Sequence, residues 1–98
     1  IFGIMSDKDH KSALREIQPF SKNIILTKPD YERAQEPGIL YSDSLKMKST
    51  NNLMLDNSVK GALEIADKMN YKRIMIIGSF FMVSDALKAL GIHDIPVK

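Results

Sequence analysis

The residues best suited to chemistry in this chain are two cations and a serine that follow apolar runs. Lys8 lies between Asp7 and Asp9, directly after the first apolar run. Ser79 follows the apolar run nearest the C-terminus, and Arg33 follows another. Ammonium, guanidinium and hydroxyl groups all donate hydrogen bonds, so this set of side chains favours a carboxylate or phosphate ligand.

Each of these residues also has a purely structural explanation, and both explanations stay open. Lys8 and Arg33 are of a type that is mostly exposed as surface charge, and a serine before a helix commonly caps it. Asp56, after another apolar run, is either a cap or a phosphoacceptor. We favour the cap, because the lysine that a phosphoacceptor site needs after its last strand has no counterpart. His10 and His93 have no partners at ligand spacing, so we expect no metal site.

The element expected to carry Ser79 is a strand over Arg73–Gly78. Its consecutive apolar residues are typical of a strand buried on both faces of a parallel sheet. Gly78 permits a sharp turn, and Ser79 suits the start of the next helix. Open α/β sheets bind ligands at the carboxyl ends of their strands, where the N–H groups of a helix N-terminus suit anions.

The rest of the chain repeats the alternation of a short apolar strand and an amphipathic helix. Further strands are expected at Ile1–Met5, Asn23–Thr27 and Asn52–Leu55. Helices are expected at Asp9–Gln18, Val59–Met69 and Phe80–Leu90. Their inward residues are expected to be Ala13, Leu14 and Ile17; Val59, Ala62, Leu63, Ala66 and Met69; and Val83, Leu87 and Leu90. This alternation predicts an α/β fold, a three-layer Rossmann-like domain whose mostly parallel sheet has helices on both faces.

Several local signals concern helix boundaries. Ser6 and Asp9 have the spacing of a capping box at the start of the first helix. Gly61 lowers the helix propensity of its segment and is expected to allow close packing on the sheet. Pro37, with the glycine after it, is expected to end a short helical turn. The polar stretch Ile39–Asn52 is expected to form a loop or a weak helix.

Composition limits the classes of function. The chain has 98 residues, of which 44% are hydrophobic, enough for one domain with a modest core. Its net charge of +2 is too small to indicate a nucleic-acid or membrane partner. It has no cysteine, which suits a cytoplasmic protein, and no apolar run of membrane-spanning length. It also lacks the glycine-rich phosphate loops that bind ATP or dinucleotides.

Four segments of the chain carry a resemblance to a known family. They are FGIMSDKD (Phe2–Asp9), IILTKPDYERA (Ile25–Ala34), DNSVKGALEIA (Asp56–Ala66) and IMIIGSFFMVSD (Ile74–Asp85). In this order the segments resemble the C-terminal domain of the folylpolyglutamate synthase/dihydrofolate synthase family, within the Mur ligase superfamily. The chain opens inside an apolar run, so residues 1–98 are expected to be part of such a domain, with its first strand and helix missing.

The resemblance implies a function in folate and one-carbon metabolism. Members of the family use ATP and Mg²⁺ to activate a folate or dihydropteroate carboxylate as an acyl phosphate, which the amino group of L-glutamate attacks. It implies that Lys8 and Ser79 hold L-glutamate, while Asp7, Asp9 and Arg33 support the cleft or the interface with the N-terminal ATP-binding domain. The parent enzyme is expected to be monomeric and cytoplasmic, and this part alone to bind no cofactor and to catalyse nothing.

Two departures from the family and two alternatives accompany this expectation. The D-G-A-H-N segment that normally precedes the first matching strand is absent, and Pro37–Asn52 shows no sign of the regular helix that many members have there. One alternative is a non-enzymatic Rossmann-like binding or interaction module, in which the D-K-D and G-S residues only cap helices. The other is the equivalent domain of another Mur-type amino-acid ligase, although the T-K-P…R-A stretch favours the folate branch.

Overall fold

The structure is a computed structural model, and it describes residues 1–47, 51–70, 73–78 and 80–91, apart from the side chain of Phe80. Its strands are β1 (Phe2–Gly3), β2 (Asn23–Leu26), β3 (Asn52–Leu55) and β4 (Ile77–Gly78). Its helices are α1 (His10–Ile17), the 3-10 helix η1 (Gln18–Phe20), α2 (Pro37–Lys46), α3 (Val59–Lys68) and α4 (Phe80–Ala89). None of these helices is both long and apolar enough to cross a membrane.

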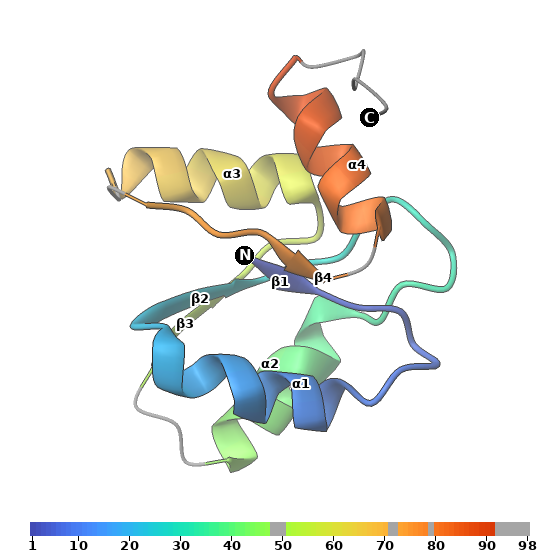
Figure 1. Cartoon of the computed structure of the whole chain (residues 1–98), viewed down its shortest axis with the longest axis vertical. Helices are drawn as coiled ribbons and strands as arrows, with labels where there is room; N and C mark the ends of the chain where they lie inside the picture. Colours follow the sequence, from blue (N-terminus) through green and yellow to red (C-terminus); the bar gives the residue numbers. More distant parts are fainter. Residues whose placement is uncertain (48–50, 71–72, 79, 92–98) are drawn as a thin grey trace, which may run out of the picture.

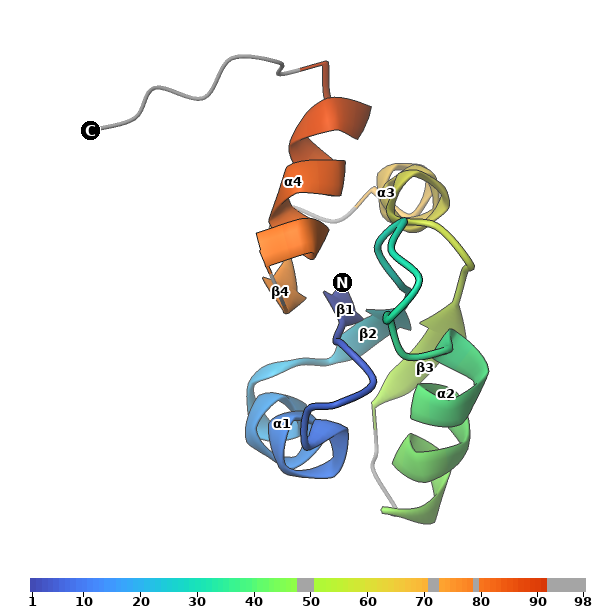
Figure 2. The ribbon, with the colours of Figure 1, turned by 90° about the vertical axis from the view of Figure 1, so that its right-hand side faces the viewer.

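The strands form one parallel sheet in the order β3-β2-β1-β4. Helices α1 and α2 cover one face, while α3 and α4 cover the other (Figures 1 and 2). The chain builds β1, β2 and β3 in one direction and then returns to place β4 on the free side of β1. Because parallel crossovers are right-handed, this reversal puts the later helices on the opposite face. The predicted α/β, Rossmann-like fold is confirmed.

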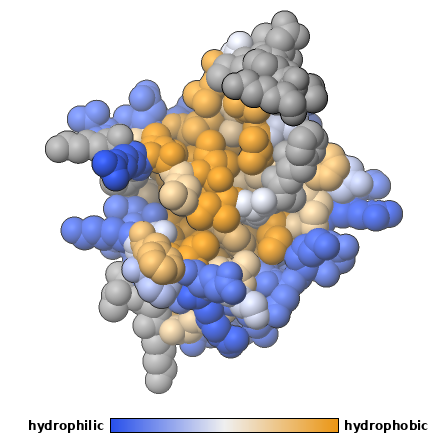
Figure 3. Space-filling model, in the orientation of Figure 1, coloured by the Kyte–Doolittle hydropathy of each residue, from blue (hydrophilic) through white to orange (hydrophobic). Residues whose placement is uncertain are grey.

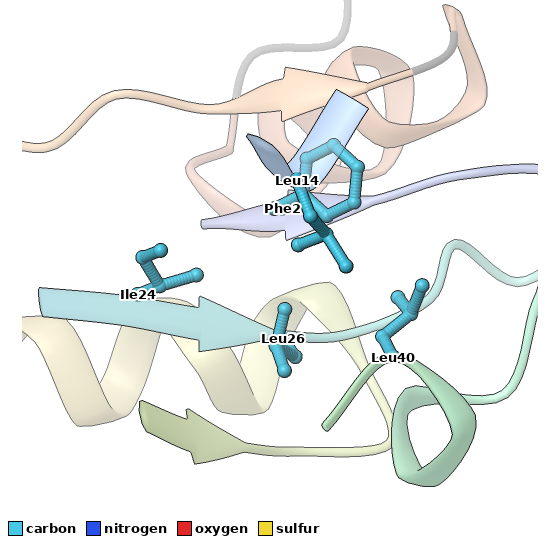
Figure 4. Close-up of a cluster of buried hydrophobic side chains, with 5 residues drawn as sticks. All are labelled: Phe2, Leu14, Ile24, Leu26 and Leu40. Atoms are coloured by element: carbon cyan, nitrogen blue, oxygen red, sulfur yellow. The ribbon is translucent and has the colours of Figure 1, made fainter. Parts of the chain in front are cut away.

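The core under the first face is built from both strands and helices. Five buried side chains meet there: Phe2, Leu14, Ile24, Leu26 and Leu40 (Figure 4). They come from β1, β2, α1 and α2, so this cluster joins the sheet to both helices. The predicted inward stripe of α1 is confirmed, because Leu14 is buried and its neighbours Ala13 and Ile17 pack against the same cluster.

On the other face, small residues bring α3 close to the sheet. Ala62 and Ala66 are buried against Ile25 of β2, and Val59 is buried against α4. These contacts confirm most of the predicted inward face of α3. The exception is Met69, which is 53% exposed because it lies just beyond the end of the helix.

The inward face of α4 differs from the prediction. Met82 and Ala86 are the buried residues, whereas Val83 and Leu90 are 44% and 60% exposed and Leu87 is half-buried. Helix α4 packs beside α3 at the edge of the sheet, so only the narrow stripe at positions i and i+4 is covered.

The prediction of a strand over Arg73–Gly78 that is buried on both faces is also wrong in extent and burial. Only Ile77 and Gly78 pair as β4, which is an edge strand, and Met75 is 71% exposed. This strand pairs with Phe2 and Gly3 of β1, and the Ile77 N–H also donates to the Ile1 carbonyl at 2.9 Å. Apolar residues of this segment therefore lie on the exposed surface as well as in the core.

A regular helix, α2, occupies the stretch expected to be irregular. Pro37 begins this helix, with Glu36 as the residue before it, and does not break one. Proline suits the first helical turn because the backbone N–H that it lacks has no partner there. Leu40 anchors the helix in the core.

Gly61 makes room for a carboxylate and not for the sheet, contrary to the prediction. The Asp56 side chain accepts hydrogen bonds from Ser58 N (3.0 Å) and Ser58 Oγ (3.3 Å). Ser58 Oγ in turn accepts the Gly61 N–H at 3.0 Å and so caps α3. A Cβ atom on Gly61 would overlap the Asp56 carboxylate. The glycine therefore allows the turn and the helix cap to form together.

A hydrogen bond between partly buried side chains joins α1 to α2. His10 Nε2 lies 2.5 Å from Asp43 Oδ2. The bond from the His10 side chain is the main cause that lowers the pKa of the Asp43 carboxyl below its ordinary 3.8. The charged carboxylate is therefore more stable in the folded chain than in the unfolded chain.

We expect Gly61→Ala to lower the free energy of unfolding by about 1 kcal/mol. Displacing the Asp56 carboxylate breaks two hydrogen bonds, each worth about 1 kcal/mol. Alanine has the higher helix propensity, which offsets about 1 kcal/mol of this loss. In an Asp56→Ala background the overlap is gone, and the same change should raise stability by about 1 kcal/mol. Urea unfolding of the four proteins measures both effects. An equal increase in both backgrounds would contradict this account of Gly61.

We expect Asp43→Asn to destabilise the chain at pH 7 and to have much less effect at low pH. Folding lowers the pKa of Asp43 below its ordinary value of 3.8. The charged carboxylate therefore stabilises the folded chain at pH values above 3.8, and this contribution is lost as the pH falls through the lower pKa of the folded chain. Urea unfolding at pH 7 and at about pH 2.5 measures the difference between variant and parent. Asp67→Asn, on the exposed face of α3, controls for the loss of one negative charge. A loss of stability in Asp43→Asn that is equal at both pH values would count against the bond.

Candidate functional site

The loops that follow β1, β2 and β3 lie at one edge of the sheet, because parallel strands end on the same side. They span residues 4–9, 27–36 and 56–58. Strands β1 and β4 are neighbours, yet the helices that follow them, α1 and α4, lie on opposite faces (Figure 2). In open α/β sheets, ligands bind at the carboxyl ends of the strands where the strand order reverses in this way.

Lys8 lies in the loop between β1 and α1, at this edge. Its backbone N–H donates to Met5 O at 3.2 Å, and its carbonyl accepts from the His10 N–H at 3.0 Å. The side chains of Lys8 and Asp7 are both exposed. The backbone thus fixes the turn, while the ammonium group extends into solvent and is accessible to an anionic ligand.

Asp9 caps α1, and the predicted capping box that begins at Ser6 is wrong. The Asp9 carboxylate accepts hydrogen bonds from Ser12 Oγ at 2.7 Å and from Ser12 N at 3.1 Å. The bond from the Ser12 hydroxyl, followed by the backbone bond, lowers the pKa of the Asp9 carboxyl. Its charge thus holds the start of the helix that follows Lys8.

Arg33 is brought beside the Lys8 loop by pairing between the two loops. Met5 and Ala34 form an isolated antiparallel bridge, and the Ser6 N–H donates to the Arg33 carbonyl at 2.7 Å. The Arg33 side chain, like that of Lys8, is exposed. Two of the predicted cations therefore lie on adjoining loops at the same edge.

Ser79 lies outside the described residues. The residue before it, Gly78, ends β4 with a backbone φ of +149°, which favours glycine. A Cβ atom at Gly78 would overlap the carbonyl of Gly3 on β1. The backbones of the two neighbouring strands therefore approach each other closely where the strand order reverses, a contact that only glycine permits.

A cleft at this edge is lined by residues that the sequence did not single out. It encloses about 790 Å³ between the β2–α2 loop, the start of α3 and the side of α4. Its cations are Lys28, Lys60 and Lys88, and Ser58 caps the helix that forms one wall. The residues predicted from the strand ends, at positions 7–9 and 33, do not line it.

The β2–α2 loop that forms another wall of this cleft is tied down by contacts from Lys28, Asp30 and Tyr31. Lys28 Nζ forms an ion pair with Glu36 at 2.8 Å, which closes the loop on itself. The Asp30 N–H donates to the Asp85 carboxylate of α4 at 2.6 Å. The Tyr31 ring stacks on Phe81, with ring centres 4.2 Å apart and planes at 10°. Phe81 is 38% exposed and packs on this loop.

The predicted residues and the cleft residues bring both signs of charge to this edge, since Asp30, Glu32 and Asp85 line the cleft beside its three lysines. Lys28 could have been predicted as a site residue from the sequence, because it follows β2 as Lys8 follows β1. No sequence signal marks Lys60 or Lys88, which the packing of α3 and α4 brings to the cleft. Among residues 1–47, 51–70, 73–78 and 80–91, no group of three or more His, Asp or Glu side chains could hold a metal ion. The exposed ammonium group of Lys8 and guanidinium group of Arg33 can donate hydrogen bonds to an acidic ligand.

Comparison of the chain with family models, with curated proteins and with solved structures finds no match.

Proposed function

We propose that this chain is part of the C-terminal, glutamate-presenting domain of an ATP-dependent folate:L-glutamate ligase. In such an enzyme an ATP-binding domain of the same polypeptide, with Mg²⁺, would form the acyl phosphate of a folate or of dihydropteroate. The present domain would hold L-glutamate at the carboxyl edge of its sheet, so that the glutamate amino group attacks the acyl phosphate. The acylated product would be an amide, with phosphate leaving.

The observation that supports this proposal most directly is the position of Lys8 relative to the strand order. Lys8 follows β1, which is one of the two strands at the point where the strand order reverses. Ligands of open α/β sheets are held by loops at this point. The segment around Lys8 is also one of the three motifs whose combination carries the family resemblance.

The charges at this edge suit L-glutamate. The ligand carries two carboxylates, and Lys8 and Arg33 are exposed cations on adjoining loops. A hydrogen bond to a charged group contributes about 1.5–3 kcal/mol, so one such contact changes affinity by roughly tenfold or more. Asp7 and Asp9 lie beside these cations and, with Arg33, would contribute to the cleft or to the interface with the ATP-binding domain.

Helix α2 also supports the proposal. Many members of the family place a regular helix after the R-A residues, and the sequence alone gave no sign of one. The structure has such a helix at Pro37–Lys46, three residues after Ala34. In this stretch the fold therefore agrees with the family, although the sequence pattern departs from it.

We expect the chain to bind L-glutamate, and Lys8→Ala to weaken that binding at least tenfold because one charge-assisted hydrogen bond is lost. Titration followed by NMR, with shifts expected in residues 4–9 and 33–35, measures the affinity. Lys11→Ala, which removes an exposed cation from α1, is the matched control and should bind normally. L-Glutamine, with one carboxylate fewer, should bind more weakly than L-glutamate.

The same titration separates the sites and the functions. If Lys60→Ala and not Lys8→Ala abolished binding, the glutamate site would move to the cleft between α3 and α4. If L-glutamate produced no saturable shift in a folded chain, the role of this domain in holding glutamate would be refuted. That result would favour the non-enzymatic binding or interaction module.

In an enzyme that joins this domain to an ATP-binding domain, we expect ADP formation to depend on both L-glutamate and a pterin substrate. Lys8→Ala should raise the KM for L-glutamate far more than the KM for ATP, because the lysine contacts only the amino acid. Turnover is measured with dihydropteroate and with tetrahydrofolate, each with and without L-glutamate. Turnover that requires another amino acid or another acid substrate would instead assign the domain to a different Mur-type ligase.

A further inference from the structure

A hydrogen bond joins the two helices that follow the cation-bearing loops of the candidate site. Helix α1 begins at His10, two residues after Lys8, and α2 begins four residues after Arg33. His10 Nε2 lies 2.5 Å from Asp43 Oδ2, and both side chains are 15% exposed. The bond is therefore mostly shielded from water, and it connects one loop to the other through their helices.

The Lys8 turn is attached directly to this bond. The His10 N–H donates to the Lys8 carbonyl at 3.0 Å, so the residue that reaches α2 through its side chain also holds the turn through its backbone. Figure 3 shows mostly hydrophilic side chains at the bottom of the view, where α1 lies. The helix is held from beneath by the buried side chain of Leu14 and at its first residue by His10. A shift of His10 would therefore move the Lys8 turn.

The loop that carries Arg33 is attached to α2 in a similar way. Lys28 Nζ forms an ion pair with Glu36 Oε1 at 2.8 Å, and Glu36 is the residue directly before α2. The buried side chain of Leu40 fixes this helix on the sheet, and Asp43 lies three residues further along the same helix. The loop, the helix and Asp43 are therefore connected to one another.

Two sets of contacts thus set the distance between the two loops. Before Lys8, the Ser6 N–H donates to the Arg33 carbonyl at 2.7 Å. After Lys8, the side chain of His10 binds Asp43. A single contact between two loops permits rotation about it, whereas two contacts on either side of the Lys8 turn limit that rotation. The bond between the helices therefore helps to fix where Lys8 lies relative to Arg33.

We propose that His10 and Asp43 are positioning residues, which set the spacing between Lys8 and Arg33 and thereby the preference for a ligand with two carboxylates. This inference rests on the proposed function, in which L-glutamate is held at this edge of the sheet. When two cations are held at a fixed spacing, the second carboxylate of a ligand binds with little further loss of conformational freedom in the loops. When the spacing varies, part of that binding free energy is spent on ordering the loops, and a ligand with one carboxylate is affected less.

We expect Asp43→Ala and His10→Ala each to lower the ratio of the L-glutamate affinity to the L-glutamine affinity about threefold or more, chiefly by weakening the binding of L-glutamate. His10→Gln should keep the ratio of the parent chain, because a glutamine amide can donate to Asp43 from about the position of Nε2. The double variant His10→Ala/Asp43→Ala should match the single variants, because the bond is already lost in each. NMR titrations of the chain with the two amino acids measure the ratio.

Two control variants separate positioning from stability and from charge. Glu64→Gly, on the exposed side of α3, weakens a helix on the opposite face of the sheet and should leave the ratio unchanged. Glu16→Gln, on the exposed side of α1, removes one negative charge and should also leave it unchanged. Hydrogen exchange of the Ser6 amide, measured without ligand, should be faster in both alanine variants than in Glu64→Gly, because the loops are held at fewer points.

The outcomes distinguish this inference from the proposed function. If the parent chain binds L-glutamate and both alanine variants keep its affinity ratio, the positioning role is overturned and the proposed function stands. A ratio that falls equally in His10→Gln or in Glu64→Gly would also overturn the positioning role, as would Ser6 exchange that is the same in all variants. A folded parent chain that does not bind L-glutamate would refute the proposed function and this role with it.

Discussion

The pairing of Phe2 with strands on both of its sides is the contact on which the rest of the structure depends. Its backbone lies opposite Leu26 of β2 and Ile77 of β4, while its side chain is buried in the cluster with Leu14 and Leu40. One residue therefore joins the two halves of the sheet and fixes the helices on one face. Because β1 lies between β2 and β4, it also positions the Lys8 loop at the carboxyl edge of the sheet, where the candidate site lies.

Local patterns in the sequence were sufficient for much of this fold. The alternation of strands and helices predicted the parallel sheet, and β3 was predicted residue for residue, since its apolar run is bounded by polar caps. The predictions that were wrong concern features that depend on contacts with distant parts of the chain. The run before Gly78 is apolar in sequence, but it lies at a sheet edge, so Ile74 and Met75 are exposed. The pattern around Pro37 predicts a helix breaker, but proline both begins helices and interrupts them, and only its neighbours decide which.

Some residues of the candidate site could likewise be predicted from the sequence, whereas others could not. The rule that ligands lie at the ends of parallel strands was sufficient to single out Lys8 and Arg33, and the structure brings their loops together through the Met5–Ala34 bridge. The rule could not reveal that the Asp9 carboxylate is engaged in capping, since the same residue types cap helices and bind ligands. Nor could it find Lys60 and Lys88, whose positions in the cleft depend on how α3 and α4 pack.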